Sequence, residues 1–238
     1  MNDHKFCFII CTNNDLLLGE ALHYIDHLEI PDGYEVDLLT VNDASSMTEG
    51  YNEAMTTSDA KYKIYMHQDV FILNKNILSD LLTIFHADPQ IGLIGVVGYE
   101  VIPSGGVMWW GERLGNLYAT NINECLKKYH DPFYYVAEVD GLFMATSHDL
   151  PWNTSLLKDW DFYDAFQCIN FLEHGYKIAA PVQMQKEPWC MHDDGEVLNL
   201  SNYNRYRHIF MEVYKKYLGK HWSEIINESH PIPPDILP

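Results

Sequence analysis

Over its first hundred residues the chain alternates apolar runs of strand length with stretches in which apolar residues recur at helical spacing. The apolar runs lie at residues 6–11, 34–41, 64–66 and 91–97, and the helical stretches at residues 16–28, 45–56 and 77–85. Asn74 is the expected N-cap of the last of these helices. Strands that alternate with helices form a mostly parallel sheet with right-handed crossovers. The pattern therefore predicts an α/β fold with a mostly parallel central sheet flanked by helices.

Polar side chains follow three of the predicted strands at the point where each strand ends. The three groups are Thr12-Asn13-Asn14, Asn42-Asp43 and His67-Gln68-Asp69. Because parallel strands end at the same edge of a sheet, these groups should line one crevice, where ligands bind in open α/β sheets. His67 and Asp69 lie two residues apart on an extended segment and point the same way, so they could share one divalent cation. The alternative is a strand edge with two solvated polar groups.

The second half of the chain is less regular. Residues 103–131 contain the adjacent Trp109 and Trp110 within a Gly-rich and polar stretch, and we interpret them as a long loop or lid. Two adjacent tryptophans either mark a ligand surface or plug a small hydrophobic subcore. Beyond this loop the pattern predicts strands at residues 136–146 and 176–182, helices at residues 163–174 and 201–217, and a Pro-rich tail at residues 231–238.

The charge balance excludes some classes of partner. Lys and Arg total 15 against 34 Asp and Glu, which gives a net charge of −19 over 238 residues. A nucleic-acid partner requires a basic surface, and so does docking on anionic lipid. A nucleotide ligand remains compatible with this charge, because a bound cation can invert the local field.

The sequence also predicts a cytoplasmic protein. We find no signal peptide and no apolar stretch that could span a bilayer. The five cysteines form no CxxC pair, and we interpret them as reduced thiols. They are Cys7, Cys11, Cys125, Cys168 and Cys190.

Several sequence blocks occur in an order that resembles the bacterial glycosyltransferase-like family with a GT-A domain, which is related to inverting nucleotide-sugar transferases. The blocks read YNEAM, KYKIYMHQDVFI, IGLIGVVG, VDGLFMAT, DWDFYDAFQ, GYKIAAP and PWCMHDDG. The resemblance extends from residue 8 to about residue 217. It implies one GT-A domain over residues 1–230, with a nucleotide-binding half (1–100) and an acceptor-side half (101–230), before the tail at 231–238.

The resemblance implies a metal site. His67-Gln68-Asp69 falls where GT-A enzymes carry the DXD motif, whose divalent ion bridges the nucleotide diphosphate. Asp69 would be a ligand, His67 replaces the first Asp of the motif, and His192 matches a third ligand found late in many such enzymes. Imidazole ligands favour Mn²⁺ over Mg²⁺, so the expected cofactor is Mn²⁺.

The resemblance also implies a nucleotide site. Thr12, Asn13 and Asn14 match positions that usually hold the base and ribose, and so does Asp43. Relatives often have two adjacent acids at the second of these places, whereas here Asn42 precedes Asp43.

Asp164 lines up with the acidic residue that begins a helix and acts as general base. A carboxylate that takes the proton of the acceptor hydroxyl suits inverting transfer, and a helix N-terminus favours its anionic form. Asp161 is the alternative candidate for the base. Asp164 could instead be an ordinary acidic residue at a helix N-terminus, without a catalytic role. Asp140 and Gly141 resemble the acceptor-side motif, and Gly141 would permit a close backbone approach.

These implications lead to the expectation of a metal-dependent glycosyltransferase. It would move a sugar from a nucleotide-diphosphate sugar to a glycan or lipid-linked acceptor, with inversion, and Trp109 and Trp110 could stack on a sugar face. A non-catalytic nucleotide- or sugar-binding module on the same fold is the alternative. A nucleotidyltransferase ranks lower, because no Gly-rich basic loop follows the first strand. A zinc hydrolase that uses His67, Asp69 and His192 is a further alternative, but the spacing of these residues matches no distinctive zinc motif.

Overall fold

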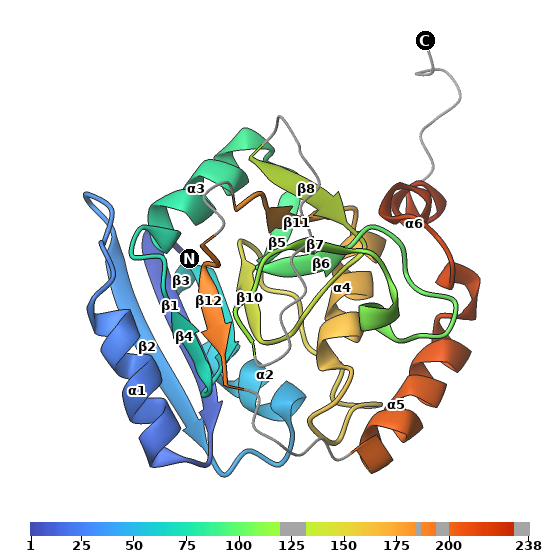
Figure 1. The fold of residues 1–238 in the computed structure, drawn as a ribbon, viewed down its shortest axis with the longest axis horizontal. Coiled ribbons are helices and arrows are strands. Elements are labelled where there is room, and N and C mark those ends of the chain that lie inside the picture. The colour runs from blue at the N-terminus through green and yellow to red at the C-terminus, as the bar shows by residue number, and fades with distance from the viewer. Residues whose placement is uncertain (120–131, 184–186, 194–199, 231–238) are drawn as a thin grey trace.

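The structure is a computed structural model that describes residues 1–119, 132–183, 187–193 and 200–230. Its main sheet (Figure 1) consists of β1 (Asn2–Thr12), β2 (Glu35–Asn42), β3 (Ala60–His67), β5 (Ile91–Gly95), β8 (Phe133–Val136), β10 (Phe143–Thr146) and β11 (Lys177–Pro181). Their spatial order is β2-β1-β3-β10-β5-β11-β8. β1 is parallel to β2 and β3, and β11 is parallel to β5, whereas β10 is antiparallel to both β3 and β5. β1, β2, β3, β5 and β11 therefore run in one direction, which confirms the predicted mostly parallel sheet.

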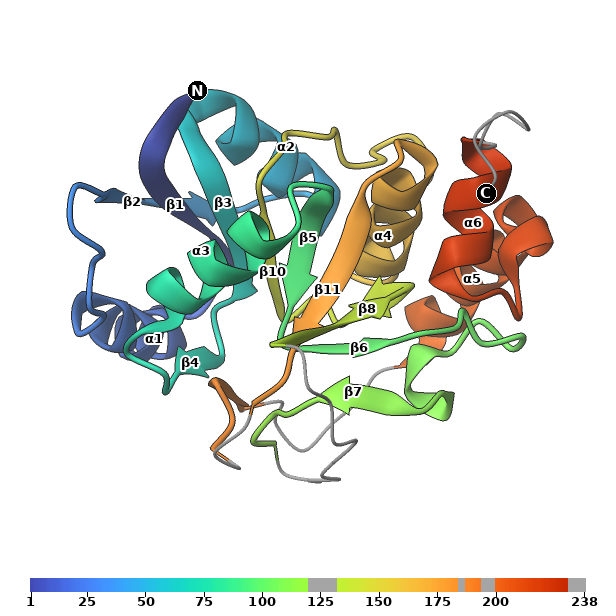
Figure 2. The same cartoon turned by 90° about the horizontal axis from the view of Figure 1, so that it is seen from above.

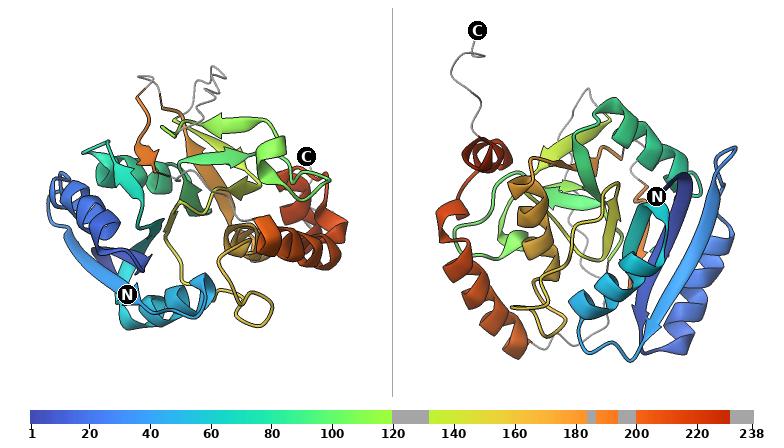
Figure 3. Two further views of the ribbon diagram at one scale, coloured as in Figure 1. Left: turned by 60° about the horizontal axis from the view of Figure 1, so that its bottom comes forward. Right: turned by 180° about the vertical axis from the view of Figure 1, so that it is seen from behind.

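Helices cover both faces of this sheet. They are α1 (Asp15–Asp26), α2 (Met47–Thr57), α3 (Ile77–Ala87), α4 (Tyr163–Glu173), α5 (Leu200–Val213) and α6 (Trp222–Ser229). Successive residues of β1 point to opposite faces, so Phe8 packs in the core under α1 and α3 while Ile9 packs in the core under α2 and α4. Burial on both faces explains why β1 reads as a continuous apolar run. α5 and α6 lie at the end of the molecule opposite α1 and β2 (Figure 3).

Two small sheets lie outside the main one. β4 (Val70–Ile72) pairs with β12 (Cys190–His192), and β6 (Val97–Tyr99) pairs with both β7 (Arg113–Gly115) and β9 (Glu138–Val139). Figure 2 shows β6 and β7 running side by side outside the main sheet. The short 3-10 helices η1 (Met108–Trp110) and η2 (Lys215–Tyr217) complete the described elements.

Two predicted strands are each divided between sheets. The strand expected at residues 91–97 breaks after Gly95 into β5 and β6. The strand expected at 136–146 begins at the last residue of β8 and continues as β9 and β10, which are separated by a break at Asp140-Gly141. At the second break the Asp140 carboxylate accepts a hydrogen bond from the backbone N–H of Leu142 at 3.1 Å. Such a local side-chain bond closes a turn, so the prediction of one continuous strand was wrong for a physical reason.

Helix ends also differ from expectation. α3 begins after Asn76 rather than Asn74. The Asn74 side chain instead accepts from Asn76 N–H at 3.0 Å and donates to Asp80 at 2.7 Å, which shapes the turn before the helix. The helix expected at residues 201–217 ends at Val213 and gives way to η2, and α6 was not predicted.

Some expectations lie outside the described residues. The end of the proposed lid (120–131), Cys125 and the Pro-rich tail are among them. The four described cysteines are free thiols, and all four are buried. Within the described part of the chain, no helix has both the length and the apolar composition needed to cross a bilayer.

Candidate active site

The three polar groups predicted at one sheet edge do meet there. Thr12 pairs with Asn42 in the register of β1 and β2, and Cys11 pairs with His67 in the register of β1 and β3. The carboxyl ends of the three parallel strands are therefore level with each other. This confirms the expectation of a common edge.

Gln68, to which the sequence analysis gave no role of its own, ties the end of β1 to the end of β3. Its side-chain oxygen accepts from the Thr12 hydroxyl at 2.8 Å and from the backbone N–H groups of Asn13 and Asn14 at 3.0 Å each. Its amide nitrogen donates to the Asn13 side chain at 2.7 Å. The Asn14 side chain caps α1 by accepting from Leu16 N–H at 3.0 Å. These polar side chains thus fix the loop after β1.

Asp43 lies on the same edge, directly after β2, and its side chain is exposed. Its φ of 57° is in the left-handed region, which is uncommon for a residue other than glycine. Backbone strain of this kind is found at functional sites more often than elsewhere.

Three possible metal ligands converge beside this edge. One ligand atom each from His67, Asp69 and His192 lies within 4.8 Å of the others. Asp69 Oδ1 is 3.8 Å from His67 Nδ1 and 3.4 Å from His192 Nε2. The two-stranded sheet of β4 and β12 brings His192 here. His192 pairs with Val70, and the N–H of Asp193 donates to the Asp69 carbonyl at 2.9 Å.

The donor set fits a divalent ion. Asp69 Oδ1 is buried and has no hydrogen-bond partner, and an orphaned carboxylate oxygen is costly unless something charged satisfies it. Ligand atoms around one ion with bonds of about 2.1 Å lie roughly 3–4 Å apart, in the range of the two distances from Asp69. Burial lowers the pKa of His67, which favours the neutral imidazole that metals bind. Burial alone would raise the pKa of Asp69, but His192 and His67 hold it below its usual value.

Asp164 lies in the first turn of α4 and faces the turn between β9 and β10. Its carboxylate accepts from Gly141 N–H at 3.0 Å and from Ala165 N–H at 2.8 Å. Burial, followed by the negative charge of Asp140, raises the pKa of Asp164 to about 7. The structure thus brings Asp164, Asp140 and Gly141 together.

The alternative base, Asp161, has a different charged neighbour. Burial and then the charge of Asp159 raise the pKa of Asp161. Asp164, in contrast, contacts Gly141 directly. The geometry therefore favours Asp164 over Asp161.

Two further acidic or polar side chains near Asp164 were missed in the sequence. Glu138 on β9 is only 2% exposed, and burial together with the charge of Asp164 raises its pKa to about 8. Tyr163 is 4% exposed and hydrogen-bonds through its hydroxyl to His67 Nε2. A lone acid inside the apolar run that precedes Asp140 was the available sequence signal for Glu138, whereas nothing in the sequence pointed to Tyr163.

The two tryptophans of the proposed lid are exposed. Trp109 is 48% exposed and Trp110 66%, so the indoles do not plug a buried subcore. The Trp109 ring lies 5.0 Å from that of Tyr203, and the Arg207 guanidinium lies 5.3 Å from the Trp110 ring. The Tyr203 ring also contacts that of Phe162, at 4.8 Å, just before α4. Ring contacts thus connect Trp109 through Tyr203 to Phe162, at the start of the helix that carries Asp164.

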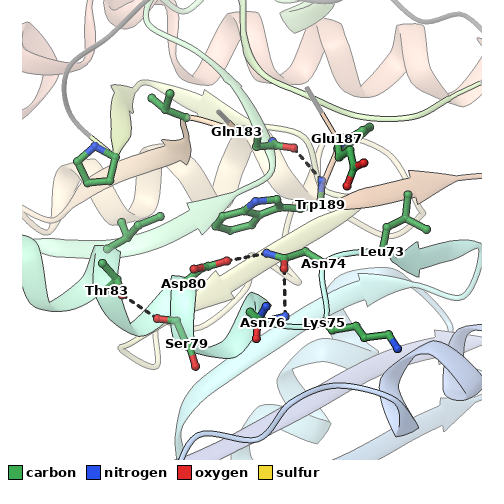
Figure 4. A pocket seen from close by; sticks show the side chains of 14 residues that line it. Leu73, Asn74, Lys75, Asn76, Ser79, Asp80, Thr83, Gln183, Glu187 and Trp189 are labelled. Carbon is green, nitrogen blue, oxygen red and sulfur yellow. Dashed lines mark hydrogen bonds between the residues drawn. The ribbon is translucent and has the colours of Figure 1, made fainter. Parts of the chain in front are cut away.

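A groove of about 860 Å³ lies at the end of the β4–β12 sheet away from His192 (Figure 4). Trp189, Asn74 and Asp80 line it, and the Trp189 carbonyl accepts from the N–H groups of Leu73 and Asn74. None of the candidate site residues lines this groove. The candidate chemistry therefore does not lie in this groove.

Comparison with known proteins gives the site a context. A family model described as "Glycosyltransferase like family" matches residues 7–214. No curated protein matches the chain.

Solved structures share the fold. The chain is similar to the mannosyltransferase PcManGT from Pyrobaculum calidifontis in complex with GDP-Man and Mn²⁺, with a TM-score of 0.58 and 14% identity, covering 94% of this chain and 68% of that one. It is similar to S. aureus TarS, with a TM-score of 0.54 and 10% identity, covering 94% of this chain and 42% of that one. It is also similar to TarS 1-349 in complex with UDP-GlcNAc, with a TM-score of 0.53, 10% identity and coverage of 94% and 71%. At these identities the likeness shows the fold, which is that of GT-A glycosyltransferases.

Proposed function

Since this chain belongs to the glycosyltransferase-like family, we propose that it transfers a sugar from a nucleotide-diphosphate sugar to a hydroxyl of a glycan or lipid-linked acceptor, with inversion at the anomeric carbon. One observation carries the proposal. One buried oxygen of the Asp69 carboxylate, Oδ1, has no hydrogen-bond partner and lies between two imidazoles at the sheet edge, and the family's expected base, Asp164, lies in the first turn of a nearby helix.

His67, Asp69 and His192 would hold a divalent ion, Mn²⁺ in preference to Mg²⁺, because two of the three ligands are imidazoles. Such an ion neutralises negative charge on the leaving nucleoside diphosphate. The complex of the similar mannosyltransferase with GDP-Man and Mn²⁺ accords with this assignment.

The nucleoside would lie against the loop after β1 and the end of β2. Thr12, Asn13 and Asn14 form an ordered polar surface through Gln68, and Asp43 presents an exposed carboxylate at the next strand end. Backbone and side-chain groups of this kind can hydrogen-bond a base and the hydroxyls of a ribose.

Asp164 would remove the proton from the acceptor hydroxyl as that oxygen attacks the anomeric carbon. A general base works best when its pKa lies near the operating pH, and the pKa of Asp164 is about 7. Asp140 and Gly141 would contact the acceptor or the transferred sugar beside it. Trp109 and Trp110 would offer exposed rings for a sugar face.

The second candidate function is a non-catalytic nucleotide- or sugar-binding module. One observation favours it: a histidine, His67, stands at the first position of the metal motif. Such a module would bind a nucleotide but would neither transfer nor hydrolyse a donor.

Calorimetric titration of metal-stripped protein with UDP and with GDP, each with and without Mn²⁺, tests the proposal. We expect nucleotide binding that requires Mn²⁺, disappears in Asp69→Ala and survives in Asp26→Ala, which changes an exposed carboxylate on α1. Donor hydrolysis or transfer that Asp164→Asn abolishes would separate the enzyme from the binding module. Absence of UDP and GDP binding under every condition would contradict both transfer from a UDP- or GDP-sugar and a module that binds these nucleotides, and would leave a sugar-binding module.

A further inference from the structure

The two ring nitrogens of His67 have different surroundings. Nδ1 faces the Asp69 carboxylate at 3.8 Å. Nε2 is hydrogen-bonded to the Tyr163 hydroxyl. A neutral imidazole carries one ring proton, so one of its nitrogens is a hydrogen-bond donor and only the other has a lone pair that can accept a proton or bind a metal. The Tyr163 bond and the availability of Nδ1 are therefore linked.

The direction of the Tyr163 bond decides whether Nδ1 can bind an ion. If the hydroxyl accepts a proton from Nε2–H, Nδ1 keeps a bare lone pair that faces Asp69. If the hydroxyl donates to Nε2, the proton lies on Nδ1 and blocks it. Histidines that bind metals almost always donate their other N–H to an acceptor. A cation near Asp69 selects the first arrangement, because it repels a proton on Nδ1.

Tyr163 is held firmly enough to impose this geometry. It is 4% exposed, and its ring packs edge-on against that of Tyr51 at 5.8 Å. Phe162, immediately before it, has a φ of 63°, so a left-handed residue sets the direction in which α4 begins. A side chain on residue 141 would collide with the Tyr163 hydroxyl. Gly141 therefore leaves the space that this hydroxyl occupies.

We propose that Tyr163 is a positioning residue that accepts a hydrogen bond from His67 Nε2 and thereby holds the imidazole in the tautomer that offers Nδ1 to a divalent cation. The inference rests on the proposed function, since it presupposes the metal site. It depends on residue 67 being a histidine, because a carboxylate at this position would have no tautomer to select. It also makes Tyr163 a direct link between the metal site and Asp164, its neighbour on α4.

The test is a double-mutant cycle read out by Mn²⁺ binding to the metal-stripped protein. Tyr163→Phe removes only the hydroxyl and keeps the buried ring. We expect it to weaken Mn²⁺ binding by about 10- to 100-fold, as the loss of outer-shell partners of metal ligands does elsewhere. In the His67→Asp background the same Tyr163→Phe change should leave the Mn²⁺ affinity unchanged, since no imidazole remains to be oriented.

Tyr51→Phe is the matched control. Tyr51 is also fully buried, and its hydroxyl bonds to the Met66 carbonyl at 3.5 Å rather than to a candidate ligand. It should leave Mn²⁺ affinity close to that of the wild type. Thermal unfolding without metal, measured for each variant, checks that folding is intact.

The outcomes separate the inference from the function it rests on. Wild-type affinity in Tyr163→Phe would overturn the inference while leaving the metal site in place. An equal loss in both the His67 and the His67→Asp backgrounds would show a general structural effect and would overturn it too. If the wild-type protein binds no Mn²⁺, the metal-dependent part of the proposed function fails and this inference fails with it.

Discussion

At the scale of single residues, the proposed chemistry depends most on Asp164. Asp164→Asn keeps the size of the side chain and can still accept from Gly141 N–H, but it cannot take a proton from an acceptor. We expect the transfer rate to fall by about 10²- to 10⁴-fold, the usual contribution of a general base. Donor binding, measured by calorimetry with UDP and Mn²⁺, should stay nearly unchanged. Unchanged transfer in the variant would remove Asp164 from the mechanism.

The raised pKa of Asp164 also has a consequence for stability. Folding raises this pKa to about 7 from an ordinary value of 3.8, so between roughly pH 4 and 7 the folded chain holds a proton that the unfolded chain has released. The free energy of unfolding therefore falls across this range as the pH rises. Asp164→Asn should gain stability relative to the wild type by about 1 to 4 kcal/mol between pH 4 and pH 8. Urea unfolding of both proteins at several pH values measures this difference, and a difference that does not change with pH contradicts the prediction.

Individual residues of the candidate site could be proposed from the sequence where a local pattern marked them. His67 and Asp69 stood out because polar residues interrupt an apolar run. The roles of Gln68 and Tyr163 could not be read in this way, because their partners lie 55 and 96 positions away in the chain. Such partners are set by tertiary packing, which no local spacing records.

At the scale of elements, the turn between β9 and β10 and the start of α4 depend on each other. A Cβ built on Gly141 would lie 2.9 Å from Asp164 Cβ and would collide with the Tyr163 hydroxyl. Gly141→Ala should therefore push α4 from the turn and destabilise the fold by about 1 to 3 kcal/mol, as overpacking does. It should also lower transfer activity and Mn²⁺ affinity, since Asp164 and Tyr163 both move.

Gly19→Ala is the matched control for this change. Gly19 lies inside α1, and a Cβ there has no atom within 4 Å. The substitution should stabilise the protein by about 0.5 to 1 kcal/mol, because alanine loses less entropy in a helix. Chemical unfolding of both variants measures the contrast, and equal stability of the two would contradict the steric account of Gly141.

The long buried elements were the predictable ones. β1 reads as a continuous apolar run because both of its faces are buried, and α4 shows helical spacing because it packs against the core. β12 and β4 were not predicted as a pair, because three-residue strands carry too few positions to show a period. The pairing is nevertheless what brings His192 to Asp69, so the least predictable element completes the candidate metal site.

At the scale of the whole molecule, the candidate site joins the two halves that we distinguished in sequence. Residues 1–100 supply His67, Asp69 and the polar loop after β1, whereas residues 101–230 supply Asp164 and Asp140. His192 also comes from the second half, although it lies with the ligands of the first. The division into a nucleotide-binding half and an acceptor-side half remains a proposal, and the metal site crosses it.

A bound ion should therefore stabilise the molecule as a whole, and its net charge of −19 decides how this must be measured. An ion that binds only the folded chain raises the free energy of unfolding by about 2.7 kcal/mol at a concentration 100 times its Kd. Any divalent cation also screens the self-repulsion of so acidic a protein, so a shift in Tm alone does not identify a site. We expect Mn²⁺ to raise Tm more than Mg²⁺ at equal concentration and ionic strength, because imidazole ligands prefer it. The excess should vanish on chelation and in Asp69→Ala, whereas general screening should persist in that variant. Equal shifts for Mn²⁺ and Mg²⁺ that also persist in Asp69→Ala would mean that the acidic surface, and not the cluster of His67, Asp69 and His192, binds the ions.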